Sequence, residues 1–278
     1  MKMLVLIFSV ALVLPSQQRT VIGDVVNTER LFSAAAVSRG VKEAFVSFLD
    51  TGCVIFRPVP VNGYRWYQDR PPAKGFLSWI PEKVELSSSG DLAYSTGPWE
   101  YRKANMEEAP AAYGHYFSVW KKNSTGEWKV VLDDGNSYQK PEKGKYVLDT
   151  ITLSSPSDPG HAFPSRGGMA ETENLFHQDI AESGFSRSLK KYAANDLRLY
   201  RSGTFPAEGI TRSMETAKHD TARYTFQRFG SDSSSSGDLG YSYGLQISSR
   251  HDTGTFVHVW RRTKLWELVI DIRSGIHK

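Results

Sequence analysis

One eight-residue pattern occurs twice in this chain of 278 residues. Residues 90–97 read Gly-Asp-Leu-Ala-Tyr-Ser-Thr-Gly, and residues 237–244 read Gly-Asp-Leu-Gly-Tyr-Ser-Tyr-Gly, an offset of 147. Four other segments return in the same order, at offsets of 138 to 144: 28–32 at 172–176, 56–57 at 200–201, 114–122 at 254–262, and 128–133 at 266–271. Ordered self-similarity of this kind indicates repeated structural units. The sequence therefore predicts two copies of one domain.

Composition places the chain among globular proteins and narrows its partners. Hydrophobic residues make up 40% and charged residues 23%, which is ordinary for soluble domains. The net charge of +4 is spread along the chain without a basic stripe, so we expect no nucleic-acid partner. Cys53 is the only cysteine, which excludes an internal disulfide. The sequence has neither metal-ligand spacing nor a phosphate or dinucleotide motif, so we expect no metal and no cofactor.

The N-terminus has the pattern of a secretory signal peptide. Lys2 precedes an apolar run over 3–14, and Pro15 and Ser16 follow it. The run is shorter than the roughly 20 residues that a membrane-spanning helix needs, so no stable membrane span is expected. We predict that residues 1–16 are a signal peptide and that the protein is secreted or periplasmic. The alternative is an uncleaved, buried segment.

Hydrophobic periodicity predicts an α+β fold for each copy. Apolar residues recur at three- and four-residue steps over 24–50, which favours a helical pair broken at Gly40. Apolar runs then favour strands at 53–57, 76–86, 91–101, 113–122 and 127–133. We expect a first domain at 24–135 and a second at 172–273 that repeats this plan. Residues 136–171, rich in Pro and Gly, are predicted to be a linker, in which 146–153 could add an edge strand.

The ordered landmarks of the first copy resemble a known superfamily. A helical pair is followed by Phe-Arg-Pro at 56–58, Leu-Ser-Trp at 77–79, the pattern at 90–97, Gly-His-Tyr at 114–116 and Gly-Glu-Trp at 126–128. This set is similar to the nuclear transport factor 2-like superfamily, and most of all to its SnoaL-like, uncharacterised secreted branch. The resemblance covers 24–135 strongly and 172–273 more weakly.

The resemblance implies two cone-shaped, strongly curved antiparallel sheets in tandem, each wrapped around its N-terminal helices, with an apolar pocket at the wide end. Superfamily members include ketosteroid-isomerase-like enzymes, polyketide cyclases, dehydratases and proteins without chemistry, so the fold alone does not settle function. Relatives tend to carry an acidic pair just before the Phe-Arg-Pro strand. The first copy has Thr51-Gly52 there, and the second has Asn195-Asp196.

Two residues are candidate catalytic bases, each with a structural alternative. His115 could be a general base in the first pocket, because the pKa of histidine lies near working pH. A half-exposed strand histidine is the alternative. Asp196 matches the family's acidic position in the second copy. Asp133 and Asp271 end matching strands and could face a pocket mouth or cap a turn. Glu29 and its counterpart Glu173 are explained by the helix dipole.

Five residues are candidate ligand contacts. Arg57 and Arg201 close matching strands, where an arginine can bind a carboxylate bidentately or form a surface ion pair. Trp79, Trp99 and Tyr101 belong to an aromatic-rich first copy, and large aromatic side chains suit either a pocket or a core. Because both readings fit the sequence, these assignments stay open at this point.

Three functions follow from these observations. The first is an exported tandem protein that binds a small apolar ligand in a cone pocket. The second is an isomerase-, cyclase- or hydratase-like enzyme that uses a His or Asp base, and the sequence leaves open whether any catalysis occurs. The third is a non-catalytic interaction module. In each case we expect the two copies to pack sheet against sheet as an intramolecular pseudo-dimer. The sequence alone names neither a ligand nor a reaction.

Overall fold

A computed structural model describes residues 16–141, 152–154 and 168–276. The predicted signal peptide lies outside these residues, except for Ser16, at which the first helix begins. Among the described helices, none is both long enough and apolar enough to cross a membrane.

The first domain consists of helices packed on one eight-stranded sheet. Its helices are α1 (Ser16–Arg39), α2 (Val41–Phe48) and α3 (Gly63–Gln68). Its strands are β1 (Leu49–Phe56), β2 (Pro60–Asn62), β3 (Phe76–Trp79), β4 (Lys83–Leu86), β5 (Leu92–Arg102), β6 (Ala112–Lys122), β7 (Trp128–Tyr138) and β8 (Thr152–Ser154). The strand order is β2-β1-β7-β6-β5-β4-β8, and β3 also pairs with β5.

The second domain repeats this plan in a six-stranded sheet. Its helices are α4 (Met169–Ser183), α5 (Phe185–Tyr192) and α6 (Gly209–Ala217). Its strands are β9 (Ala193–Arg201), β10 (Ala207–Glu208), β11 (Tyr224–Ser233), β12 (Leu239–Ser248), β13 (Thr253–Arg262) and β14 (Trp266–Gly275). The order β10-β9-β14-β13-β12-β11 matches β2-β1-β7-β6-β5-β4 of the first domain.

The predicted tandem α+β architecture is confirmed by this common order. Gly40 and Gly184 separate the two helices of each pair at φ 95° and 87°, a left-handed region that favours glycine. Two pairings go beyond the expected antiparallel meander. The strand after each helical pair runs parallel to the last long strand, β1 with β7 and β9 with β14. In addition, β8 lies inside the predicted linker and pairs in parallel with β4; it overlaps the end of the edge strand expected at 146–153, of which residues 146–151 lie outside the described residues.

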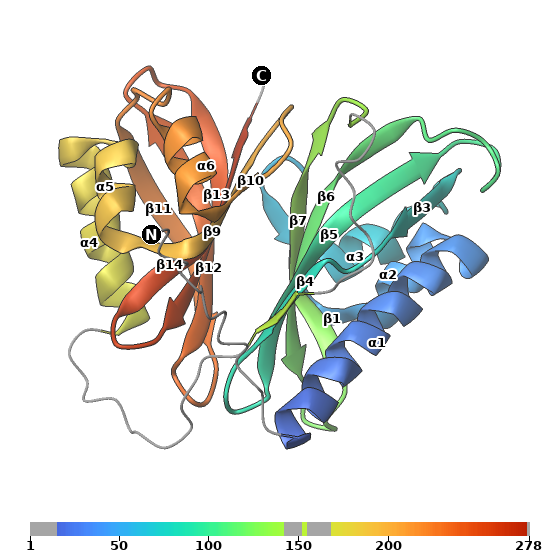
Figure 1. The fold of residues 1–278 in the computed structure, drawn as a ribbon. Coiled ribbons are helices and arrows are strands. Elements are labelled where there is room, and N and C mark those ends of the chain that lie inside the picture. Colours follow the sequence, from blue (N-terminus) through green and yellow to red (C-terminus); the bar gives the residue numbers. More distant parts are fainter. Residues whose placement is uncertain (1–15, 142–151, 155–167, 277–278) are drawn as a thin grey trace, which may run out of the picture.

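Each sheet has a helix-covered face and a face turned towards the other domain (Figure 1). Because successive strand residues point to opposite faces, β6 contributes to both layers. Tyr116 and Trp120 pack in the core under α1 and α2, whereas Phe117 and Val119 pack towards the second domain. β6 therefore has almost no exposed face.

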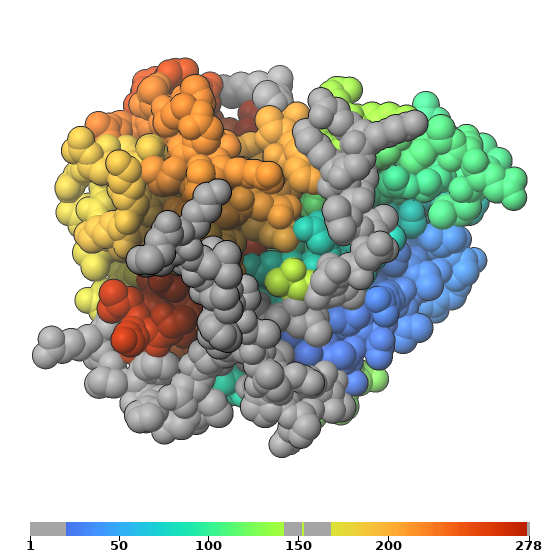
Figure 2. Space-filling view, in the orientation of Figure 1, coloured from blue at the N-terminus to red at the C-terminus, as the bar shows by residue number. Residues whose placement is uncertain are grey.

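The two sheets share an apolar cluster. Its buried members come from β1, β5, β6 and β7 of the first domain and from β9, β12, β13 and β14 of the second. The described parts of the domains lie directly against one another in the space-filling view (Figure 2). Turn contacts are reciprocal: the Ser88 amide donates to Asp238 at 3.0 Å, and the Ser235 amide donates to Asp91 at 3.1 Å. Both pairs are related by the offset of 147, as in a two-fold interface.

Candidate functional site

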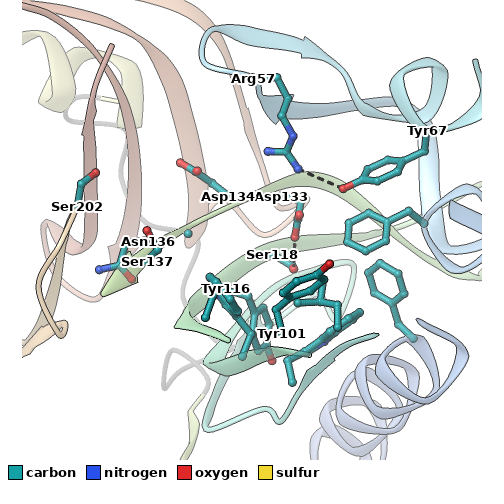
Figure 3. Close-up of a pocket in the computed structure, with 17 residues that line it drawn as sticks. Arg57, Tyr67, Tyr101, Tyr116, Ser118, Asp133, Asp134, Asn136, Ser137 and Ser202 are labelled. Carbon is teal, nitrogen blue, oxygen red and sulfur yellow. Dashed lines mark hydrogen bonds between the residues drawn. The ribbon is translucent and has the colours of Figure 1, made fainter. Parts of the chain in front are cut away.

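A cavity of about 450 Å³ lies between the helices and the concave face of the first sheet (Figure 3). Its lining includes four of the predicted ligand contacts, Arg57, Trp79, Trp99 and Tyr101. Further aromatic walls are formed by Phe32, Phe45, Tyr67 and Tyr116. The repeated strand landmarks thus bring these side chains together at one place in the fold.

One wall of the cavity carries the carboxyl groups of Asp133 and Asp134 on β7. Asp133 pairs with Ser118 across the β6–β7 ladder and accepts a hydrogen bond from its hydroxyl at 2.8 Å. The side chain of Asp134 points the other way along the rim (Figure 3). Burial raises the pKa of Asp133 to about 6, and burial followed by repulsion from Asp133 raises the pKa of Asp134 to about 7. Both groups can therefore exchange a proton near neutral pH.

Two further polar groups frame this wall. The guanidinium of Arg57 donates to the Tyr67 hydroxyl at 3.1 Å, which holds the arginine at the mouth. The hydroxyl of Tyr116 is buried and has no hydrogen-bond partner among the described residues. A buried hydroxyl without a partner is costly. A ligand group that bonds to Tyr116 would remove this cost.

Glu29 fixes the aromatic wall from behind. Its carboxyl accepts hydrogen bonds from the indole nitrogens of Trp79 at 2.5 Å and Trp120 at 2.8 Å, and another from the Ser95 hydroxyl. Burial raises the pKa of Glu29 to about 7, although these hydrogen bonds lower it in part. The explanation of Glu29 by the helix dipole is wrong, because α1 begins at Ser16 and Glu29 lies in its middle.

The structure places His115 away from this cavity. Tyr116 and Ser118 face the cavity, so the pleat of β6 turns His115 to the opposite face. There its Nδ1 is hydrogen-bonded to the Tyr138 hydroxyl at 2.7 Å, and its Nε2 lies 3.3 Å from Glu82. The ring is fully buried. His115 as a base in the first cavity is therefore a prediction that the geometry does not support.

Asp196 also lies outside the cavity of the first domain. Its carboxylate forms ion pairs with Lys83 of the first domain and Arg261 of the second, each at 2.7 Å. Burial opposes ionisation, but Arg261 and Lys83 hold the pKa of Asp196 well below its usual range. A carboxylate committed to two cations is a poor base. Asp196 instead links the domains, and the acidic residues that line the first-domain cavity are Asp133 and Asp134.

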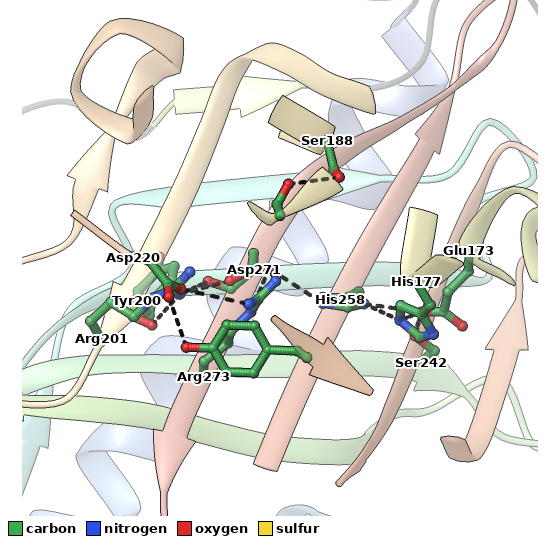
Figure 4. Close-up of polar contacts among 12 residues, drawn as sticks. Glu173, His177, Ser188, Tyr200, Arg201, Asp220, Ser242, His258, Asp271 and Arg273 are labelled. Atoms are coloured by element: carbon green, nitrogen blue, oxygen red, sulfur yellow. Dashed lines mark hydrogen bonds and ion pairs between the residues drawn. The ribbon is translucent and has the colours of Figure 1, made fainter. Parts of the chain in front are cut away.

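The second domain fills the corresponding space with a charged network (Figure 4). Arg273 stands at the position of Gly135, and its guanidinium carbon lies 3.8 Å from the centre of the Phe185 ring. Asp271, the counterpart of Asp133, pairs with Arg201 at 2.7 Å and Arg273 at 3.0 Å. Burial acts against ionisation, but these two arginines hold the pKa of Asp271 well below its usual range. The predicted ligand contact Arg201 thus belongs to this network.

The network continues through two histidines. His258 lies 3.3 Å from Asp271 through Nε2 and 3.1 Å from Glu173 through Nδ1, and His177 Nε2 lies 3.4 Å from His258 Nδ1. Glu173, His177 and His258 thus gather three groups of the kind that bind metals. Arg228 already pairs with Glu173 at 2.9 Å, however. A cation would have to enter beside this arginine, so the cluster favours internal ion pairs over a metal ion.

No protein-family model matches the chain, and no curated protein matches it. The similar solved structures include a putative ketosteroid isomerase from Parabacteroides distasonis, with 19% identity over 42% of this chain and 86% of that chain at a TM-score of 0.32. A nuclear transport factor 2-like protein of unknown function from Pseudomonas putida has 13% identity over 39% of this chain and 88% of that chain, at a TM-score of 0.32. Nuclear transport factor 2 from Cryptosporidium parvum has 11% identity over 38% of this chain and 90% of that chain, at a TM-score of 0.33.

These likenesses are too weak to say anything about function. The fold is defined by the chain's own strand order, with a helical pair followed by a curved sheet in both halves. Each domain thus has the helical pair and the curved sheet that the resemblance implied. In the first domain the cone interior contains an aromatic-lined cavity, and in the second it contains ion pairs beside a polar cavity.

Proposed function

We propose that the first domain binds a small, largely apolar ligand in the cavity bounded by Trp79, Trp99 and Tyr116. The observation that carries this proposal is the aromatic-lined volume of about 450 Å³, which falls in the range of small-molecule sites. A second observation supports it. The equivalent position to cavity-lining Gly135 is occupied in the second domain by the long, charged side chain of Arg273, so an apolar interior is not a general property of this chain's cones.

The polar wall defines how such a ligand would lie. An apolar body would contact the tryptophans, while one hydroxyl or amine would face Asp133 and the Tyr116 hydroxyl. The polar lining residues lie mainly on β7 and at the mouth, and the other walls are aromatic. These aromatic walls disfavour sugars and nucleotides, because many of their hydroxyls would lose their hydrogen bonds there.

A neutral fluorescent probe, N-phenyl-1-naphthylamine, tests this proposal. Its emission should rise on binding to the full chain, and apolar amines or alcohols should displace it. Ala112→Trp places a large ring in the cavity and should weaken the probe's binding about tenfold or more. Ala111→Trp, one residue earlier and exposed, is the matched control. Equal binding by both variants would contradict the proposal.

A catalytic function is the second candidate, and the elevated pKa of Asp133 in an apolar cavity favours it. Such a carboxylate could remove a proton from carbon or oxygen in an isomerase-, cyclase- or hydratase-like reaction. Asp133→Asn should then reduce the turnover of any substrate about a hundredfold or more while leaving probe affinity nearly unchanged. Unchanged turnover would remove Asp133 from the mechanism.

We also propose that the protein is exported and that its two domains act as an intramolecular pseudo-dimer. Lys2 and the apolar run after it support export, and N-terminal sequencing of protein from its native host should find residue 17 first.

The shared apolar cluster and reciprocal turn contacts support the pairing of the two domains. Sedimentation should therefore give a monomer, whereas an intact Met1 or an obligate dimer would contradict the respective proposals.

A further inference from the structure

The second domain has its own cavity, at the open end of its cone. It has a volume of about 410 Å³ and lies among the end of α6 and strands β11 to β14. Its lining is polar and carries three arginines, Arg201, Arg250 and Arg273. Tyr224 and Gln246 form further walls, and the acidic residues Asp220 and Asp252 lie at its edge.

Two of these arginines have donors that no group of the described residues satisfies. Arg273 is only 4% exposed; its Nε and Nη2 donate to Asp271 at 3.1 and 3.0 Å, whereas its Nη1 has no hydrogen-bond partner among the described residues. The nearest carboxylate oxygen to that atom, on Asp220, is 4.0 Å away. Arg201 likewise uses Nη1 on Asp271 and leaves Nη2 without a partner. Buried donors in this state indicate a missing acceptor.

The same cavity also has an acceptor without a donor. Gln246 is buried, and its Oε1 has no hydrogen-bond partner among the described residues. Gly254 lies opposite Gln246 on the neighbouring strand. A Cβ atom there would meet the Ser274 carbonyl oxygen at 2.5 Å, so this part of the lining is restricted to bare backbone.

Equivalent positions of the two domains have opposite chemistry. The offset of 147 relates Trp99 to Gln246, and the offset of 138 relates Gly135 to Arg273. All four residues line cavities. A single place in the fold is therefore apolar in the first domain and cationic and hydrogen-bonding in the second.

We propose that the cavity of the second domain binds a small hydroxycarboxylate anion. Its carboxylate would accept hydrogen bonds from the free Nη atoms of Arg273 and Arg201, because guanidinium groups bind carboxylates with matched geometry. Its hydroxyl would donate to Gln246 Oε1. Arg250, exposed at the rim, attracts the anion during approach. The acids at the edge set an upper limit on charge, since Asp220 and Asp252 would repel a polyanion.

Titration calorimetry of the full chain with sodium malate in a chloride buffer tests this inference. We expect one site per chain. Arg250→Gln should weaken malate binding about fivefold or more, because a rim charge steers and holds the anion. Arg212→Gln, which removes an exposed arginine of α6 outside the cavity, should leave binding unchanged. Equal weakening by both variants would overturn the proposal, because it would show a general charge effect.

A second pair of probes tests the contact with Gln246. The unsubstituted protein should bind malate more tightly than succinate, which lacks the hydroxyl, and Gln246→Leu should remove this preference. A preference retained in that variant, or tighter binding of inorganic phosphate than of malate, would contradict the assigned chemistry. The cavity-filling variant Ala112→Trp should bind malate normally, which separates this site from the first-domain cavity.

Discussion

Glu29 of α1 and Glu173 of α4 occupy the same position in the two domains, at an offset of 144, and their carboxyl groups have opposite surroundings. Glu29 accepts hydrogen bonds from neutral donors, two of them tryptophans, and burial raises its pKa to about 7. Burial acts on Glu173 as well, but the hydrogen bond and charge of His258, with a hydrogen bond from Ser242, lower its pKa to about 2. One repeated residue therefore holds a proton near neutral pH in one domain and is ionised in the other.

Substituting Glu29 with Gln should flatten part of the pH dependence of stability. The folded pKa of about 7 exceeds the reference value of 4.5, so the unfolded state releases its proton first as pH rises. The stabilisation that protonated Glu29 gives the folded state is complete below pH 4.5 and is lost as the pH rises through 7. From pH 4.5 to 7.5, Glu29→Gln should gain up to about 3 kcal/mol in unfolding free energy relative to the unsubstituted protein. Urea titrations measure this, with exposed Glu127→Gln as the control; curves that stay parallel would contradict it.

The matching substitution in the second domain should have the reverse profile. Glu173→Gln leaves Arg228 and His258 without their buried carboxylate, which should cost about 3–5 kcal/mol at pH 7. Because the folded pKa of about 2 lies below the reference value of 4.5, the Glu173 carboxylate stabilises the unsubstituted protein fully above pH 4.5. This stabilisation disappears as the pH falls towards 2. The cost should therefore shrink in acid. A cost of the same size at pH 3 and pH 7 would argue against the ionic role of Glu173.

His115→Ala should affect stability and leave the first cavity unchanged. The substitution removes a buried ring that contacts Tyr138 and Glu82 on the far side of β6, so we expect a loss of about 2–4 kcal/mol. Affinity for N-phenyl-1-naphthylamine should stay within about twofold, since the side chain does not line the cavity. A large loss of probe affinity in folded protein, verified by circular dichroism, would return His115 to the ligand site.

Asp196→Asn should loosen the contact between the domains. The substitution weakens two ion pairs at once and leaves Lys83, which is nearly buried, without its anion. Because Asp196 is itself partly exposed, we expect a cost of only about 1–2 kcal/mol. A double-mutant cycle with Lys83→Met should show coupling between Asp196 and this partner in the first domain. Additive effects would mean that the pair contributes little to joining the domains.

The sequence predicted the fold and the cavity better than the chemistry. Apolar runs predicted the strands that bring Arg57, Trp79, Trp99 and Tyr101 to one cavity. His115 was misplaced because both faces of β6 are buried, so hydrophobic alternation cannot tell the cone face from the face against the other domain. Which face of β6 packs under the helices decides it, and that depends on contacts with distant elements that the sequence of β6 does not reveal.

Two other features depended on distant parts of the chain. Arg273 lies near the end of the last repeat landmark, where sequence similarity between the copies has already faded, so its insertion over Phe185 could not be inferred. Similarly, β8 joins the first sheet from within the Pro- and Gly-rich stretch. Local composition describes that stretch as a linker, but a free strand edge on β4 gives three of its residues a partner.

In a dimer of identical chains, every substitution is made twice, so a change that suits one pocket is imposed on both. The paired turn contacts, from Ser88 to Asp238 and from Ser235 to Asp91, hold two halves that are encoded separately. A mutation can therefore alter one half without its mirror image. Selection could leave a glycine at position 135 and an arginine at position 273 within a single inherited unit. One gene can in this way keep two differently lined cone interiors at a fixed one-to-one ratio.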